Sequence, residues 1–378
     1  MPNVNCYRLQ LGLALAPLGL GLAGPIQFGP PMSEPSPFLL WDLSTTVRPS
    51  FGYKDNPTLA PDAFKSGSAF LGLGAEVLIF RLPTGDDSFH LFWAGDDRRY
   101  LNSDLVDTEQ LFVTQASYRR TLGDGWSAGL SAQHVFVNQV IDLSSEDLGI
   151  GIGRAAGHTL TLRPSVRLDV GTHWYVEAET EGTRQLYDAP LDDYWEYVPK
   201  LLLGFRFAHD SSATAAYTHT WRPFDDSQLL TPSRELLPGT DTRIQSDRLE
   251  LRWRQNWNAA KSWSTTVRGF HVLTRDNGLG FFDYHRTGVS GTVQWAPGRW
   301  TLKATARASR YDYDEQLIAP DEDTTRVRED LAVETRVEFA LRKTLLLFAS
   351  YELDHSQGNV SQDNFTANTF QGGLEWEF

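Results

Sequence analysis

Charged side chains that alternate with apolar ones are the residues of this chain best placed to do chemistry. In RLELRWRQNW (248–257) and WTLKATARAS (300–309), every second residue is polar or charged and the residues between are largely apolar. Rows of charged side chains along one wall select passing ions by their charge. Thirteen charged positions of this kind are predicted to line one surface: Arg163, Arg167, Arg206, Arg248, Glu250, Arg252, Arg254, Arg268, Lys303, Arg307, Glu334, Arg336 and Glu338.

Two interpretations of this charged surface are open. Most of its members are basic, so one interpretation is a constriction that favours anionic or polar solutes. The other is a lattice of salt bridges in which the carboxylates neutralise their basic neighbours and no selectivity results. Both can hold in one molecule, because a sixteen-stranded barrel leaves an aqueous channel unless a loop fills it.

The elements that must position these residues are β-strands. From residue 41 to the end, segments of about ten or more residues alternate in the strand period, which is the length of a tilted membrane strand. Seven short separators alternate with eight long polar ones. The pattern predicts an all-β fold: a single transmembrane antiparallel β-barrel of about 16 strands, with short periplasmic turns and longer extracellular loops.

The first forty residues have a different composition. Residues 1–23 combine Arg8 with an apolar stretch that ends in small residues, which predicts a secretory signal peptide. Residues 24–40, GPIQFGPPMSEPSPFLL, are rich in proline and predict a periplasmic leader. The barrel is predicted over residues 41–378.

Tryptophan distinguishes a membrane barrel from a secreted soluble β-protein with the same alternation. Eight of the twelve tryptophans lie within a few residues of a predicted short turn or a chain end: Trp41, Trp126, Trp174, Trp257, Trp263, Trp295, Trp300 and Trp376. Indole prefers the headgroup layer, so this grouping predicts an aromatic girdle at the periplasmic interface. The location predicted is therefore the bacterial outer membrane.

The closing octapeptide, QGGLEWEF, carries the strand pattern to the last residue. Gln371, Gly373, Trp376 and Phe378 resemble the C-terminal signal of outer-membrane proteins that the barrel-assembly machinery reads. The pattern implies that this machinery is a partner and that the last strand closes the barrel against the first. Trp376 and Phe378 are expected to face lipid at the periplasmic rim.

The stretch VRPSFGYKDNPTLAP (47–61) resembles the beginning of a group of outer-membrane β-barrel porins. These often carry an aromatic residue followed by an Asp-Asn step, here Tyr53, Asp55 and Asn56, whereas Lys54 and Pro57 depart from their pattern. Some of the group are associated with exopolysaccharide export operons. The resemblance implies a porin-like protein connected with polysaccharide traffic.

Other kinds of chemistry have weaker support. The whole chain has a formal net charge of −14, which argues against nucleic acid as a partner. The single cysteine, Cys6, lies in the predicted signal, so a disulfide or a thiolate metal site is not expected in the mature chain. The nine histidines are scattered outside any nucleophile motif, so no catalytic residue, no metal and no cofactor is assigned. Acidic loop clusters are expected to face solvent and lipopolysaccharide.

The function predicted is passive diffusion of small polar or anionic solutes through a charged lumen. The first alternative is a non-conducting barrel, an accessory to polysaccharide export or a surface scaffold or adhesin, in which loop 139–157 or loop 224–242 folds inward and seals the lumen. The second alternative is an outer-membrane barrel hydrolase. The expected partners are outer-membrane lipid, lipopolysaccharide and small polar solutes, and the apolar outer wall leaves room for a homotrimer.

Overall fold

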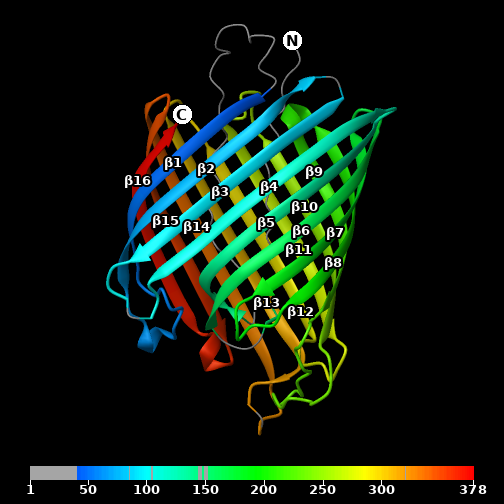
Figure 1. The fold of residues 1–378 in the computed structure, drawn as a ribbon, viewed down its shortest axis with the longest axis vertical. Helices are drawn as coiled ribbons and strands as arrows, with labels where there is room; N and C mark the ends of the chain where they lie inside the picture. Colours follow the sequence, from blue (N-terminus) through cyan, green and yellow to red (C-terminus); the bar gives the residue numbers. More distant parts are fainter. Residues whose placement is uncertain (1–40, 85, 104, 144–146, 149–151, 320) are drawn as a thin grey trace.

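The computed structural model describes residues 41–378 except 85, 104, 144–146, 149–151 and 320. The predicted signal peptide and leader lie outside the described residues. Sixteen strands form a single closed barrel in which each strand is paired with the strands before and after it (Figure 1). The predicted fold class and strand number are confirmed.

The strands follow the alternating segments of the sequence. The first eight are β1 (Trp41–Lys54), β2 (Ser68–Thr84), β3 (Asp87–Tyr100), β4 (Thr108–Gly123), β5 (Trp126–Asp142), β6 (Ile152–Val170), β7 (Trp174–Tyr187) and β8 (Tyr194–Phe207). The second eight are β9 (Ser211–Pro223), β10 (Arg243–Asn256), β11 (Trp263–Asp276), β12 (Tyr284–Trp295), β13 (Trp300–Leu317), β14 (Thr325–Arg342), β15 (Leu345–Gly358) and β16 (Phe365–Glu377).

The remaining described structure consists of connections and three short 3₁₀ turns, η1 (Asp62–Phe64), η3 (Ala208–Asp210) and η4 (Ser361–Asp363). No helix within the described ranges is long and apolar enough to cross a membrane. The short turns lie at the end of the barrel that also holds the start of β1 and the C-terminus, and the longer loops lie at the other end (Figure 1). We refer to these as the periplasmic and extracellular ends.

Antiparallel pairing of β1 with β16 closes the barrel. The register runs from Thr46 opposite Glu377 to Lys54 opposite Thr369, and the backbone N–H of Phe378 donates to the carbonyl of Thr45 at 2.9 Å. The sequence prediction that the last strand pairs with the first is therefore confirmed. Closure leaves no unpaired sheet edge, which a membrane interior requires.

The outer wall is apolar. Along β10, Leu249 and Leu251 are 62% and 67% exposed, while the residues between them point to the other side of the sheet. The same alternation leaves leucine, valine and aromatic side chains exposed on most strands. A soluble protein does not expose apolar surface of this extent, so this face is the one in contact with lipid.

The periplasmic girdle of tryptophan is also confirmed. All eight predicted tryptophans lie at the periplasmic ends of strands, and each is between 44% and 53% exposed. Several pack against a neighbouring ring: Trp300 lies 4.6 Å from Phe339 with the rings tilted, and Trp376 stacks on Phe378 at 4.9 Å between centroids. Trp376 and Phe378 thus lie on the lipid-facing surface of the rim.

The prediction of a loop at 139–157 is wrong at both ends. Pairing of β5 with β6 continues up to Asp142 opposite Ile152, so only residues 143–151 connect the strands. The glycines that suggested a flexible loop have a packing role, because a Cβ on Gly157 would lie 2.2 Å from the carbonyl oxygen of Leu186. The predicted loop at 224–242 has the bounds that the structure shows.

Candidate functional site

The barrel lumen is the candidate site, and the predicted charged residues all lie on inward positions of its wall. They come from β6, β8, β10, β11, β13 and β14, and each alternates along its strand with lipid-facing residues. Contacts between strands that are not neighbours confirm the inward direction of such positions. Arg119 of β4 lies 3.4 Å from Glu177 of β7, which is possible only through the lumen.

One sector of the lumen is strongly basic. The basic wall is defined here as the inward residues Arg248, Arg252, Arg254, Arg268, Arg286, Lys303 and Arg307 of β10–β13. Glu250 is the carboxylate within this sector. The nitrogen atoms of Arg248, Arg252 and Arg268 lie 3.2, 3.1 and 2.6 Å from its oxygens. Three cations thus share one carboxylate, and the wall carries seven basic side chains beside it.

Phe270 holds the arginines of the basic wall at a fixed spacing. The guanidinium carbons of Arg248, Arg268 and Arg286 lie 4.3, 5.8 and 5.4 Å from the centroid of its ring. An aromatic face attracts cations and restricts their motion. The register places Phe270 opposite Glu250 and beside Gly288, which leaves room for the ring. Residues of β10–β12 therefore supply both the charge of these arginines and the ring that fixes their position.

A second sector, β6–β8, is a balanced lattice. Arg163 contacts Glu179 at 3.6 Å and also pairs with Glu181. Further along the wall, Arg167 and Arg206 both pair with Asp169, at 3.0 and 2.7 Å. Charges here are neutralised locally. The lattice of salt bridges expected from the sequence therefore describes this sector, β6–β8.

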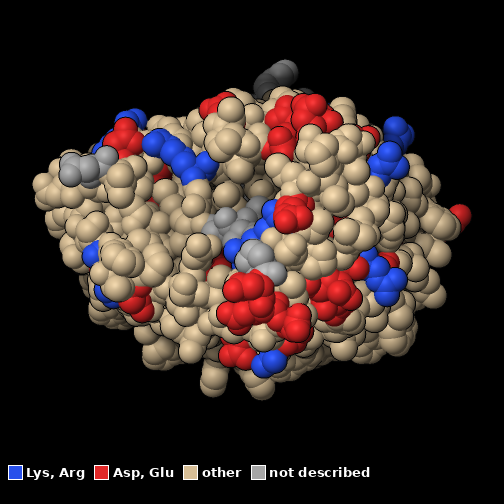
Figure 2. All heavy atoms as spheres, turned by 90° about the horizontal axis from the view of Figure 1, so that it is seen from below, with Lys and Arg blue, Asp and Glu red and all other residues tan. Residues whose placement is uncertain are grey.

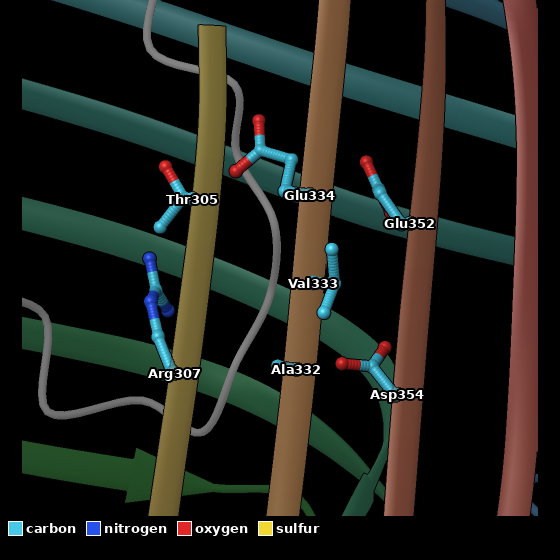
Figure 3. Close-up of a pocket in the computed structure, with 7 residues that line it drawn as sticks. All are labelled: Thr305, Arg307, Ala332, Val333, Glu334, Glu352 and Asp354. Atoms are coloured by element: carbon cyan, nitrogen blue, oxygen red, sulfur yellow. The ribbon is translucent and has the colours of Figure 1, made fainter. Parts of the chain in front are cut away.

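A third sector is acidic. Seven inward carboxylates on β2, β3 and β14–β16 form an acidic wall: Glu76, Asp96, Glu334, Glu338, Glu352, Asp354 and Glu375. Arg48 and Arg336 neutralise part of it, through Glu76 at 2.6 Å and Glu375 at 2.7 Å. Figure 3 shows where this sector meets the basic wall, in a pocket where Arg307 faces Glu334, Glu352 and Asp354.

Most of the acidic wall was missed by the sequence analysis. Of its seven carboxylates, Glu334 and Glu338 were predicted as site residues. Those not predicted are Glu76, Asp96, Glu352, Asp354 and Glu375, together with the neighbouring Arg48 and Arg98. The strand period was available for β1–β3 as well, but glycines at 72 and 74 interrupt the charged positions there. Pairs such as Arg98 with Glu352, 3.7 Å apart on β3 and β15, follow only from the stagger of strands around the barrel.

The extracellular end of the lumen is crossed by the β5–β6 tip, defined as the described residues 139–143, 147–148 and 152. Asp142 forms an ion pair with Arg328 of β14, nine strands further along the chain. Asp147 lies 3.5 Å from Arg222 of β9 and accepts a hydrogen bond of 3.4 Å from the hydroxyl of Tyr284 on β12. The tip therefore reaches across the mouth to the opposite side.

Apolar contacts reinforce this crossing. Val140 packs against two clusters, one containing Leu59 and Phe365 and the other containing Phe70 and Tyr100. Leu148 packs on the cluster formed by Phe224, Ile244, Phe281 and Phe282. Loop 224–242 lies over the mouth rather than within the lumen, since Arg234 donates to the carbonyls of Leu317 and Ile318 at the end of β13. The tip and this loop therefore meet at the mouth, because Leu230 of the loop packs on the same cluster as Leu148.

Buried ion pairs hold the loops of the mouth together. Lys54 donates to Glu109 at 2.8 Å, and the hydroxyl of Tyr100 donates to the same carboxylate at 2.9 Å. Arg326 and Asp363 pair at 2.6 Å with side chains that are 1% and 0% exposed. Burial raises the pKa of the Asp147 carboxyl, although Arg222 and the Tyr284 hydroxyl act in the opposite direction. The outside of the mouth carries clusters of acidic side chains (Figure 2).

A histidine hydrogen-bonded to a serine hydroxyl is not found in the described part of the chain. Histidine contacts a hydroxyl at three places there, and in each the hydroxyl belongs to threonine: Thr172 with His173, Thr287 with His271 and Thr366 with His355. Carboxylates instead contact other histidines, His219 and His285. Across residues 41–378, apart from the stretches left undescribed, no group of three or more metal-ligating side chains is arranged around a common point.

The architecture is that of a bacterial outer-membrane protein. A closed barrel satisfies every strand edge, its outer wall is apolar, and tryptophan marks its periplasmic rim. These are the features by which a β-barrel is adapted to a bilayer.

No family model matches the sequence, and no curated protein matches it. Solved structures are similar in fold. The outer membrane protein OprD of Pseudomonas aeruginosa is 10% identical, with 89% of this chain and 94% of OprD covered and a TM-score of 0.47. OccAB1 of Acinetobacter baumannii is 10% identical over 89% and 96%, with a TM-score of 0.42. Outer-membrane expressed OmpT of Vibrio cholerae is 10% identical over 89% and 97%, with a TM-score of 0.44.

Proposed function

We propose that this protein is a porin-like channel for the passive diffusion of small anionic solutes across the outer membrane. The observation that carries the proposal is the basic wall, in which three arginines share Glu250 and further cations follow on β12 and β13. Each unit of positive charge on the wall contributes on the order of 1 kcal/mol to the energy of a passing anion. Anions are therefore favoured over cations of the same size.

Because of the acidic wall, the charge on one side of the lumen differs in sign from the charge on the other. A solute at the pocket of Figure 3 has Arg307 on one side and Glu352 and Asp354 on the other. Such a field orients a solute that carries both an anionic and a cationic or hydrogen-bonding group. Small polar molecules with one acidic group are thus the class that best fits the wall.

Reconstitution tests this proposal. The chain from residue 24 is refolded in detergent, inserted into a planar bilayer and held across a salt gradient. Stable current steps of fixed size, with a reversal potential of the sign that anion passage produces, support the proposal. A reversal potential of the opposite sign contradicts it, because the basic wall would then not control passage.

A non-conducting barrel is the second candidate, and the β5–β6 tip is the observation that favours it. The tip contacts β9, β12 and β14 through Asp147 and Asp142. A tip held in this way obstructs the mouth without closing the periplasmic end. If the folded barrel carries no current but a variant lacking residues 143–151 does, the protein is an accessory or scaffold rather than a diffusion channel.

A further inference from the structure

The outer face of β3–β6 carries two rows of side chains near its extracellular end. The strand registers place both rows on the lipid-facing side, where they share a face with Leu160, which is 50% exposed, and alternate with inward residues such as Val113. The row nearer the periplasm, called here the aromatic row, consists of Trp93, Phe112, Phe136 and His158. The row nearer the extracellular end, called the polar row, consists of Arg99, Asp97, Gln110, Asn138 and Arg154.

The aromatic row is continuous from strand to strand. Trp93 stacks on Phe112 with 6.3 Å between ring centroids, and Phe112 stacks on Phe136 at 5.9 Å. His158 follows at 5.1 Å from Phe136. Phe136 lies ten residues beyond Trp126 of the periplasmic girdle, which is about 24 Å along the membrane normal on a strand tilted by about 45°. The apolar band of an outer-membrane barrel is about 25 Å tall, so this row marks the outer boundary of the hydrocarbon.

Hydrogen bonds join the polar row from end to end. Arg99 Nε and Gln110 Nε2 donate to Asp97 at 2.8 and 3.0 Å. Asn138 Nδ2 donates to Gln110 at 3.4 Å, and Asn138 Oδ1 accepts from Arg154 Nε at 2.7 Å. The members in the middle of the row therefore satisfy one another, and the row ends in an arginine on β3 and an arginine on β6.

The two arginines lie on either side of Thr108. Arg99 is opposite Thr108 in the register of β3 with β4, and Arg154 Nη2 donates to the Thr108 hydroxyl at 3.5 Å. The arginine side chains are 56% and 45% exposed. Arg99 uses only Nε in its bonds to described side chains, and the Nη contacts of Arg154 are 3.4 Å or longer. Both guanidinium groups can therefore donate to an anion in the headgroup layer.

A cavity opens beside the polar row, between β5, β6 and the connection from β7 to β8. Its volume is about 450 Å³, and its polar side chains are Asn138, Arg154 and Asp188. The rest of its lining is small or apolar and includes Leu143 and Pro190. Amide, carboxylate and guanidinium groups in an otherwise apolar hollow can bind the hydroxyl groups of a sugar, since together they supply both donors and acceptors.

We propose that this surface binds a phosphorylated glycolipid of the outer leaflet. Its phosphate accepts hydrogen bonds from Arg99 and Arg154. A sugar ring enters the cavity beside Asn138 and Asp188, and the acyl chains lie along the aromatic row. The two rows match the order of such a lipid, because headgroup contacts lie outside the hydrocarbon boundary and aromatic contacts lie on it. A simple phospholipid has the phosphate and the chains but no sugar for the cavity.

Lipid titration of the refolded barrel tests the proposal. The chain from residue 24 is held in detergent and titrated with diphosphorylated lipid A, and native mass spectrometry counts the lipids on each folded barrel. We expect saturable binding of one lipid A, and we expect the double variant Arg99→Gln/Arg154→Gln to weaken it by about tenfold or more. The matched control is Arg310→Gln, an outward arginine of β13 with 55% exposure, which should leave the affinity unchanged.

Two other lipids identify the part of the ligand that is recognised. Lipid A without its phosphates should bind the unaltered chain about as weakly as complete lipid A binds the double variant. Phosphatidylglycerol, which has a phosphate but no sugar ring, should bind about tenfold more weakly than lipid A. Asn138→Ala should weaken the binding of lipid A and leave that of phosphatidylglycerol unchanged. Heat-modifiable mobility shows whether each variant is folded.

Three results overturn the proposal. Equal weakening by Arg310→Gln and by the double variant shows that any outward arginine serves. Equal affinity for phosphatidylglycerol and lipid A shows that the cavity takes no sugar. A double variant that binds lipid A normally but no longer forms an oligomer assigns the two rows to contact with a second copy of the chain. All three results are independent of whether the barrel conducts.

Discussion

Glu250 organises the charge of the lumen at the scale of single residues. Its carboxylate pairs with Arg248, Arg252 and Arg268. The guanidinium groups of Arg248 and Arg268 also lie over the ring of Phe270. The carboxylate therefore positions the arginines without cancelling their charge. If the proposed function holds, the positive charge of this wall selects the solutes that pass, so the arginines are the side chains to alter.

Replacing Arg252 with glutamine should weaken anion preference. The change removes one unit of charge and keeps much of the volume, so we expect the anion-to-cation permeability ratio to fall about fivefold, which corresponds to roughly 1 kcal/mol. The ratio is obtained from the reversal potential in a salt gradient. Arg310→Gln is the control, because Arg310 is exposed outside the lumen and pairs with Asp312; an equal effect of both changes would contradict a role for the basic wall.

The pair of Arg326 and Asp363 should dominate the stability of the mouth. Asp363→Asn leaves a guanidinium that is 1% exposed without its carboxylate, a change that costs about 3–5 kcal/mol. We expect a lower urea midpoint for unfolding in detergent. Asp312→Asn, which affects an exposed pair of the same residue types, should change the midpoint little. A small effect of Asp363→Asn would show that the pair does not hold η4 to β14.

At the scale of elements, the β5–β6 tip should respond to pH through Asp147. Burial raises the pKa of this carboxyl, so the closed tip is stabilised by the protonated form below the ordinary value of 3.8. That stabilisation is lost as pH rises through the raised pKa. The groups that face Asp147 are Arg222, Tyr284, Arg286 and Glu196. Closure is thus favoured by acid.

Single-channel open probability should therefore increase from acidic to neutral pH in the unaltered protein. Asp147→Asn cannot ionise and keeps the volume of the protonated form, so its open probability should stay low over the same range. Current steps recorded at several pH values check this. Identical pH profiles for the two proteins would show that Asp147 does not control the tip.

The last strand carries a prediction about assembly. Phe378 contributes a stacked pair with Trp376 and a backbone bond to Thr45, both at the periplasmic rim. We expect Phe378→Ala to lower the amount of folded barrel in the outer membrane of cells while refolding in detergent is unaffected, because the rim contacts add little stability. Equal loss in both settings would mean that Phe378 acts in folding rather than in recognition by the assembly machinery.

The strands were predictable from the sequence because each alternation is local. The parity of RLELRWRQNW placed Arg248, Glu250 and Arg252 on one face, and the structure puts them in the lumen. Tryptophan positions likewise located the periplasmic ends. The β5–β6 tip was not predictable, since its glycines suggested a loop and its partner Arg328 lies 186 positions after Asp142 in the chain. Contacts across a lumen depend on the stagger of all the strands.

At the scale of the whole molecule, the barrel combines a lipid-facing wall with three distinct inner sectors. The basic wall of β10–β13, the lattice of β6–β8 and the acidic wall that begins at β14 lie around one lumen. Asp142 and Asp147 of the extracellular tip reach across the mouth of this lumen. Passage of small anions is the function that this arrangement supports.

Single-channel recording in a planar bilayer across a salt gradient, with the chain from residue 24, tests that central claim most directly. We predict fixed current steps with an anion-selective reversal potential. A folded, heat-modifiable barrel that carries no current, or one that prefers cations, would contradict the account.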